Sequence, residues 1–256
     1  YFEYAGTRFK LIQNNPRKWS DVLITILPQL DAAQEQRVFS SAAEFASALS
    51  WALTAPITIR YVGGMGIPAG YTLRRAKCRV FVFPQLPYLG KHVGFSIDRI
   101  ADIQNEKQRK ALVLYREALS ANKDLLSLLL YWQILEIGRP NPVAWVNQME
   151  ARRPRGSHLS PADLGRLPMR GRPLGAYLED DCRHAIAHIK RRPGMTALRF
   201  DDIDDSGRMA LSARVAESLA AHYIRTELNL THWLHLVRLT PRAFPVYCDG
   251  NWNPKA

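Results

Sequence analysis

The residues best suited to chemistry gather in one short stretch, Asp181-Cys182-Arg183-His184-Ala185-Ile186-Ala187-His188. Arg183 precedes His188 by five positions, and His184 follows the arginine directly. A guanidinium is permanently charged and holds phosphate well, whereas an imidazole gains and loses a proton near neutral pH. The combination predicts chemistry on a phosphodiester, and RNA is the favoured substrate.

RNA supplies its own nucleophile, the 2′-hydroxyl, so catalysis needs only proton transfer and stabilisation of negative charge on the phosphoryl oxygens. In this interpretation His188 is the general acid/base and Arg183 binds the scissile phosphate. The products are a 2′,3′-cyclic phosphate and a 5′-hydroxyl end, and the reaction needs neither a metal nor another cofactor.

Two other interpretations stay open. In the first, Asp180, His184 and His188, which follow one another at one-turn spacing, bind zinc in a metal-dependent hydrolase. In the second, the residues are structural: Arg183 pairs with Glu179 or Glu136, and the histidines fill a polar seam between helices.

The stretch belongs to a predicted helix from about Leu174 to Lys190, which ends before Pro193-Gly194. On an α-helix Arg183 and His188 lie ~140° apart, so they converge on one ligand only if the helix borders a cleft. Glu179 lies one turn before Arg183 and is positioned to restrain it.

The segment Arg183 to His188 resembles the RxxxxH motif of the HEPN superfamily (higher eukaryote and prokaryote nucleotide-binding domains). His184 fits the polar residue that follows the arginine in that motif. Upstream, Leu128 to Ile137 resembles the family's first long helix, with Tyr131, Trp132 and Glu136 near its end. The resemblance covers roughly residues 103 to 235. A fainter overall resemblance is to methylamine-utilisation accessory proteins.

The HEPN resemblance implies a helical bundle that forms a homodimer, with two motif copies across a shared cleft. It also implies metal-independent endoribonuclease activity, in toxin–antitoxin, antiviral-defence or RNA-processing systems, with an antitoxin or regulatory protein as a possible partner. Carried onto this chain, Arg183 orients phosphate, His188 handles the proton, His184 supports RNA contact or geometry, and Glu136 holds Arg183. Some family members lose catalysis, which leaves a non-catalytic basic RNA- or nucleotide-binding dimer as the alternative.

Charge supports a polyanionic partner, because the chain carries a net charge of +12 and has a pI of about 9.9. Arginines concentrate in a proline- and glycine-rich stretch after residue 150, predicted to be a mobile loop without a core. The residues predicted to bind RNA are Arg152, Arg153, Arg155, Arg166, Arg170, Arg172, Lys190, Arg191 and Arg192.

The predicted fold class is α+β. Residues 1–100 form an N-terminal domain of mixed α/β or β-rich character and unknown role, with strands over Val22–Leu27, Ile57–Val62 and Lys77–Phe83 and a helix over Ala42–Leu53. Residues 101–240 form the HEPN-like helical domain, and residues 241–256 form an extended tail. Within the helical part, Ile103–Ile137 contains no glycine or proline and reads as one long helix.

Further along, a short helix is predicted from Pro142 and a longer one from about Ser206 to Leu230. The acidic residues Asp201, Asp202, Asp204 and Asp205 precede the longer helix and are predicted to cap it rather than to bind a metal.

Three widely spaced cysteines and the absence of a long apolar run favour a cytoplasmic protein without a membrane span. The chain begins with tyrosine, so the natural start, and any targeting segment, is expected to lie upstream.

Overall fold

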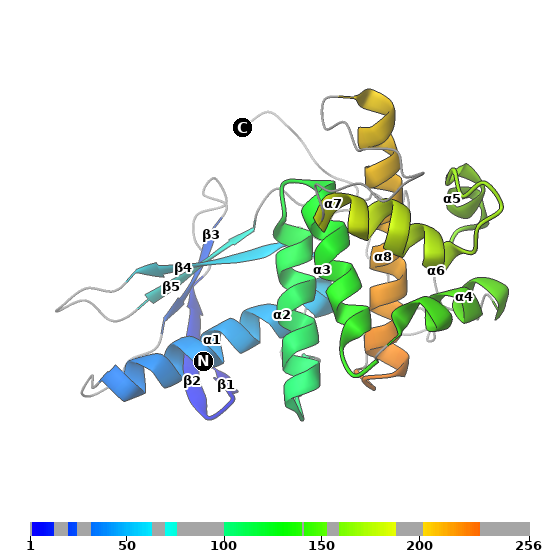
Figure 1. The fold of residues 1–256 in the computed structure, drawn as a ribbon. Helices are drawn as coiled ribbons and strands as arrows, with labels where there is room; N and C mark the ends of the chain where they lie inside the picture. Colours follow the sequence, from blue (N-terminus) through cyan, green and yellow to red (C-terminus); the bar gives the residue numbers. More distant parts are fainter. Residues whose placement is uncertain are drawn as a thin grey trace, which may run out of the picture.

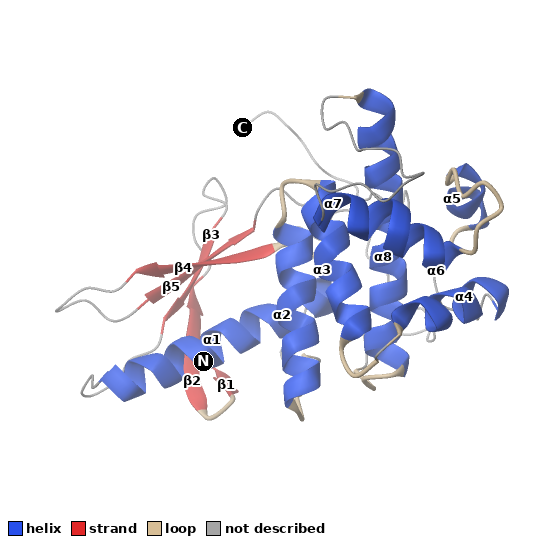
Figure 2. Cartoon of the chain, viewed as in Figure 1, coloured by secondary structure: helices blue, strands red, loops and turns tan. Residues whose placement is uncertain are grey.

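A computed structural model describes residues 2–12, 20–24, 32–62, 70–75, 100–139, 141–152, 159–187 and 202–230. Its fold is α+β, as the sequence predicts. A small antiparallel sheet and one long helix occupy one side of the molecule, and a helical bundle occupies the other (Figures 1 and 2).

The sheet has five strands in the order β1-β2-β3-β5-β4, and every neighbouring pair is antiparallel. The strands are β1 (Phe2–Tyr4), β2 (Thr7–Ile12), β3 (Ser20–Ile24), β4 (Ile57–Val62) and β5 (Gly70–Arg75). Ala5 and Gly6, between β1 and β2, both have positive φ, as a tight hairpin turn requires. The prediction for Ile57–Val62 is confirmed to the residue; the strand predicted over Lys77–Phe83 lies outside the described residues.

Helix α1 (Ala32–Leu53) joins the sheet to the bundle. Val38, Ala42 and Phe45 of this helix form a small core with Phe9 of β2 and Ile57 of β4. Farther along the helix, Ala48 and Trp51 belong to the core of the bundle. One helix therefore contributes to both cores, which ties the first hundred residues to the helices that follow.

The long helix predicted over residues 103–137 is wrong, because the chain forms two helices there, α2 (Glu106–Ser120) and α3 (Asp124–Glu136). The break contains neither glycine nor proline, and a side-chain hydrogen bond joins the two helices across it. Ser127 on α3 donates to the carbonyl of Ala118 near the end of α2. A serine that bonds to the backbone in this way competes with the helical ladder.

Four further elements follow α3: α4 (Pro142–Arg152), α5 (Pro161–Arg166), a continuous helical run from Leu174 to Ala187, and α8 (Ile203–Thr226). Helix α4 begins at the proline that the sequence indicates. Helix α8 begins at Ile203, three residues earlier than predicted, because Asp202 accepts hydrogen bonds from the amides of Asp204 and Asp205. The predicted capping role of the acidic run is thus confirmed at Asp202.

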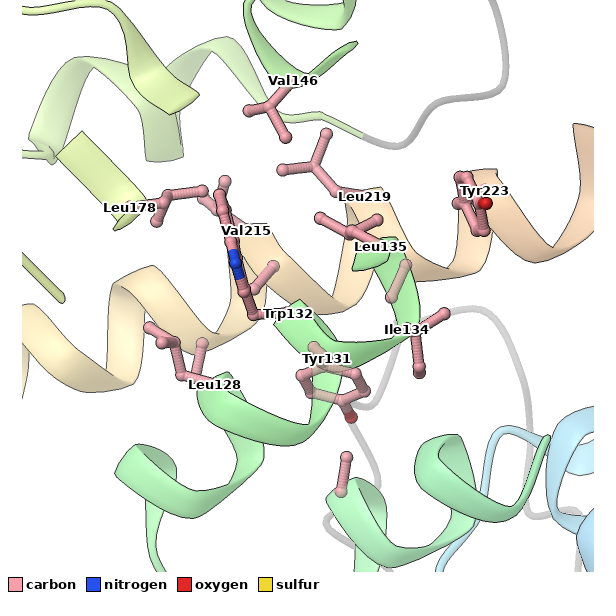
Figure 3. Close-up of a cluster of buried hydrophobic side chains, with 14 of the residues drawn as sticks. Leu128, Tyr131, Trp132, Ile134, Leu135, Val146, Leu178, Val215, Leu219 and Tyr223 are labelled. Atoms are coloured by element: carbon pink, nitrogen blue, oxygen red, sulfur yellow. The ribbon is translucent and has the colours of Figure 1, made fainter. Parts of the chain in front are cut away.

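The bundle core lies between α3, α8 and the helical run. Figure 3 shows the Trp132 indole of α3 between Leu178 and Val215, with Leu128 and Leu219 nearby. All five side chains are almost completely buried. This packing fixes the helical run that carries the candidate site against α3 and α8.

The prediction that the basic stretch forms a loop without a core is wrong for residues 159–167, whereas residues 168–173 contain no helix or strand. Leu159, Leu164 and Leu167 are buried in the bundle core, and Ser160 caps α5 by accepting from the amide of Asp163. Three buried leucines therefore outweigh the loop-forming composition around them.

Candidate functional site

Helix α4 holds the first turn of the helical run that carries the predicted motif. Asn147 Oδ1 accepts from the amide of Gly175 at 2.7 Å, and Glu150 Oε2 accepts from the amide of Leu174 at 2.8 Å. These amides open a helix and have no partner within it. A Cβ on Gly175 would lie 2.5 Å from the carbonyl oxygen of Val143, so only glycine allows this close approach.

The motif itself is partly π-helical. The run consists of α6 (Leu174–Ala176), a π-helical segment η2 (Tyr177–His184) and α7 (Ala185–Ala187). The expected helix is present from Leu174, but its hydrogen bonds over η2 are i→i+5 rather than i→i+4. Such segments are rare and often occur at functional sites. His188 and the predicted end of the helix at Lys190 lie outside the described residues.

Segment η2 has a buried side and a polar side. Tyr177, Leu178 and Cys182 point into the bundle core. Asp180, Arg183 and His184 remain partly exposed. The motif polar groups are therefore at the surface of the bundle and accessible to solvent.

Arg183 makes the ion pair with Glu136 that the sequence anticipates. Its Nη2 lies 3.0 Å from Oε1 of Glu136, which is the last residue of α3. The two side chains are 30% and 35% exposed. Glu179, the other predicted partner, lies one turn away on the same helix, yet the ion pair of Arg183 is with Glu136.

His184 accepts from Arg183. The Nη1 of Arg183 lies 2.9 Å from Nε2 of His184, and a guanidinium can only donate. Nε2 therefore acts as the acceptor in this contact, and the other ring nitrogen, Nδ1, lies on the side of Asp180. That nitrogen lies 3.4 Å from Oδ1 of Asp180, one turn earlier. In this arrangement His184 orients Arg183 and is not itself a proton donor toward it.

Arg172, whose contact with RNA stays a prediction, holds the acidic side of η2. Its Nη2 lies 2.5 Å from Asp180 Oδ2, and its Nη1 lies 2.7 Å from Asp181 Oδ2. Nη2 also donates to the carbonyl of Ala176 at 3.3 Å. The guanidinium is therefore occupied by two carboxylates and one carbonyl of the motif helix.

A second arginine braces η2 from α8. Arg208 donates to the carbonyl oxygen of Asp181 at 3.4 Å and pairs with Asp205 at 2.9 Å. Neither Arg208 nor the paired role of Asp181 was anticipated, because nothing in the local sequence shows that α8 lies beside the motif. The ion pairs of Arg172 have a weak signal in the sequence, because this arginine precedes Asp180 by eight residues and Asp181 by nine.

The buried side of η2 carries no activated nucleophile. Burial raises the pKa of the Cys182 thiol, and burial also raises the pKa of Tyr177 to about 12. Both groups lie 3.5 Å from the hydroxyl of Ser212 on α8. A thiol held protonated in this way is a packing group that contributes a weak hydrogen bond.

The remaining predicted residues fall into two groups. Arg152, Arg166 and Arg170 are exposed near α4 and α5, where they are accessible to a polyanion. Outside the described residues lie Arg153, Arg155, His188, Lys190, Arg191 and Arg192.

Within the described part of the chain, no group of three or more histidine, cysteine, aspartate or glutamate side chains is arranged to hold a metal ion. The alternative zinc site of Asp180, His184 and His188 includes a residue outside that part. Among the described helices, none combines the length and the apolar character needed to cross a bilayer.

In a comparison with known proteins, a family model matches most of the helical bundle. The family model described as methylamine utilization protein MauJ matches residues 111–225, which run from α2 to the last turn of α8 and exclude the sheet and α1. The fainter resemblance seen in the sequence is thereby confirmed over this region, whereas the HEPN resemblance stays a prediction. No curated protein and no solved structure matches the chain.

Proposed function

We propose that this chain is a metal-independent endoribonuclease of the HEPN type, which cleaves RNA by attack of the 2′-hydroxyl on the adjacent phosphate. The observation that carries the proposal is the state of Arg183. This cation is partly exposed and is oriented from two sides, by Glu136 at 3.0 Å and by His184 at 2.9 Å.

An oriented cation is what this reaction requires of a metal-free site. During attack a bond forms between the 2′-oxygen and phosphorus, and the bond to the 5′-oxygen breaks. Negative charge grows on the non-bridging oxygens, and a guanidinium held in place beforehand stabilises that charge without reorganising. The pair with Glu136 keeps the guanidinium in that place, and a guanidinium has further N–H donors that can bind phosphate.

Proton transfer is assigned to His188. It takes the proton of the 2′-hydroxyl or returns one to the leaving 5′-oxygen, as an imidazole does efficiently near neutral pH. His184 is a poorer candidate, because its Nε2 is occupied by Arg183 and its Nδ1 faces Asp180.

The test is cleavage of a labelled single-stranded RNA in EDTA, with the product ends mapped. The expected products carry a 2′,3′-cyclic phosphate and a 5′-hydroxyl. Arg183→Ala and His188→Ala should each lower the cleavage rate by roughly 100-fold or more. The matched control is Lys110→Ala, which removes one exposed cation from α2. Cleavage that persists in both site variants at the wild-type rate would refute the assignment.

A second candidate function is RNA binding without cleavage, by a basic dimer. The same ion pair favours it, because Glu136 already offsets the charge of Arg183. This alternative predicts salt-dependent RNA binding, with no new ends in any condition. Replacing the exposed Arg152, Arg166 and Arg170 would then weaken binding, whereas Arg183→Ala would have little effect.

A further inference from the structure

We propose that Arg172 is a positioning residue of the motif: by bridging Asp180 and Asp181 it holds η2 in the register that keeps His184 and Arg183 in contact. The inference rests on the proposed function only where it predicts an effect on RNA cleavage. Its structural part stands on the contacts of Arg172 alone.

The contacts form one continuous chain across the surface of the bundle. Arg172 pairs with Asp180 at 2.5 Å, and the other oxygen of Asp180 lies 3.4 Å from Nδ1 of His184. The Nε2 of His184 accepts from Arg183, which pairs with Glu136. Four successive contacts therefore join a residue outside the motif helix to the last residue of α3.

Charge explains why this chain needs Arg172. Asp180 and Asp181 are adjacent carboxylates on a helix of unusual register, and they repel one another when unpaired. An arginine that holds both with separate nitrogens offsets the repulsion and fixes the distance between them. It also leaves one oxygen of Asp180 directed at His184, which sets the orientation of the imidazole ring.

The π-helical register supplies the second argument. A π-helical turn is not favoured by local sequence and persists where tertiary contacts impose it. Arg172 bonds to the carbonyl of Ala176 at the start of η2, while Arg208 bonds to the carbonyl of Asp181 within it. Removing Arg172 should let η2 relax toward α-helical register and move Arg183 relative to Glu136.

The competing role for Arg172 is direct RNA contact, as its place in the basic stretch predicts. The two roles predict different salt dependence of RNA affinity. An arginine that is already neutralised by two carboxylates causes no release of counterions when RNA binds. A free arginine that contacts a phosphate contributes about 0.7 to the slope of log affinity against log salt for single strands.

The experiment compares Arg172→Gln, Arg172→Lys and Arg170→Gln in the full chain. Arg170 is an exposed neighbour two residues away, so its replacement removes the same charge. The first readout is the Nε–Hε NMR signal of Arg183, assigned by its loss in Arg183→Lys. The second is the salt dependence of binding to a labelled single-stranded RNA, and the third is the separation of kcat from KM for cleavage.

The expected result is a shifted or exchange-broadened Arg183 signal in Arg172→Gln, but not in Arg170→Gln, with wild-type circular dichroism in both. Arg172→Gln should keep the wild-type salt slope and lower kcat by roughly 10- to 100-fold with little change in KM. Arg172→Lys keeps the positive charge but loses the two separate donor nitrogens of the guanidinium. Its kcat should therefore lie between those of Arg172→Gln and the wild type.

An unchanged Arg183 signal in Arg172→Gln overturns the inference, and so does a salt slope reduced by about 0.7. If neither the wild type nor any of the variants cleaves RNA, the proposed function fails. The Arg183 signal then still decides whether Arg172 positions the motif, so the two failures are distinguishable.

Discussion

Glu217 on α8 should make the stability of this fold depend on pH. Burial raises its pKa from 4.5 to about 7. Burial, and then the charge of Glu217, raises the pKa of Tyr115 on α2 and of Tyr131 on α3, so the carboxyl lies near these two buried side chains. An ionised carboxylate in such surroundings is costly, because burial removes the water that would solvate its charge.

The sign follows from the direction of the shift. The folded state holds the proton of Glu217 more tightly than the unfolded state, so the associated stability is complete below pH 4.5 and is lost as the pH rises to about 7. One pKa unit corresponds to about 1.4 kcal/mol, so the difference between 4.5 and about 7 sets an upper bound of about 3 kcal/mol at pH 8.

Glu217→Gln removes this charge with almost no change of shape. Urea unfolding at pH 4.5, 6 and 8, followed by tryptophan fluorescence, measures the free energy of unfolding of both proteins. The variant should match the wild type at pH 4.5 and exceed it at pH 8 by up to about 3 kcal/mol. Glu117→Gln, which removes an exposed carboxylate from α2, is the control. A Glu217→Gln variant less stable than the wild type at pH 8 would refute the reasoning.

Two further stability changes test how the motif helix and α8 begin. Gly175→Ala should destabilise the fold by about 1–3 kcal/mol in urea unfolding, because the added Cβ meets the Val143 carbonyl at 2.5 Å. Gly207→Ala is its matched control, since nothing lies within 4 Å of that Cβ, and helix propensity alone should stabilise it by about 1 kcal/mol. Asp202→Ala should cost about 1 kcal/mol in thermal unfolding, because it removes the acceptor for the amides of Asp204 and Asp205. Equal melting temperatures for Asp202→Ala and the wild type would contradict the capping role.

Elements set by local sequence could be predicted. The β-branched run Ile57–Val62, the helix start at Pro142 and the cap at Asp202 are each encoded within a few residues. The ion pair of Arg183 with Glu136 was also anticipated, as one of two alternatives in the structural interpretation and again from the HEPN resemblance. Its place in the structure follows from the packing of α3 against the motif helix.

Elements decided by distant contacts could not be predicted. The break after Ser120 lacks a glycine or proline, and a serine of α3 bonds back to α2 across it. The basic stretch was interpreted from its arginines, prolines and glycines, yet Leu159, Leu164 and Leu167 decide its structure by entering the core. In both cases burial outweighs composition, and burial is known only after the partners are placed.

The register of the motif helix is the clearest example of this second kind, and it bears directly on function. Local propensity alone would continue an α-helix from Leu174. The observed segment is instead held from outside: α4 caps its first amides, Arg172 joins its two aspartates, and Arg208 bonds to a carbonyl within it. Each support comes from another part of the chain, so the geometry of Arg183 depends on the whole bundle. A variant that weakens any one support should therefore alter the motif before it unfolds the protein, because the bundle core lies on the opposite face of the same helix.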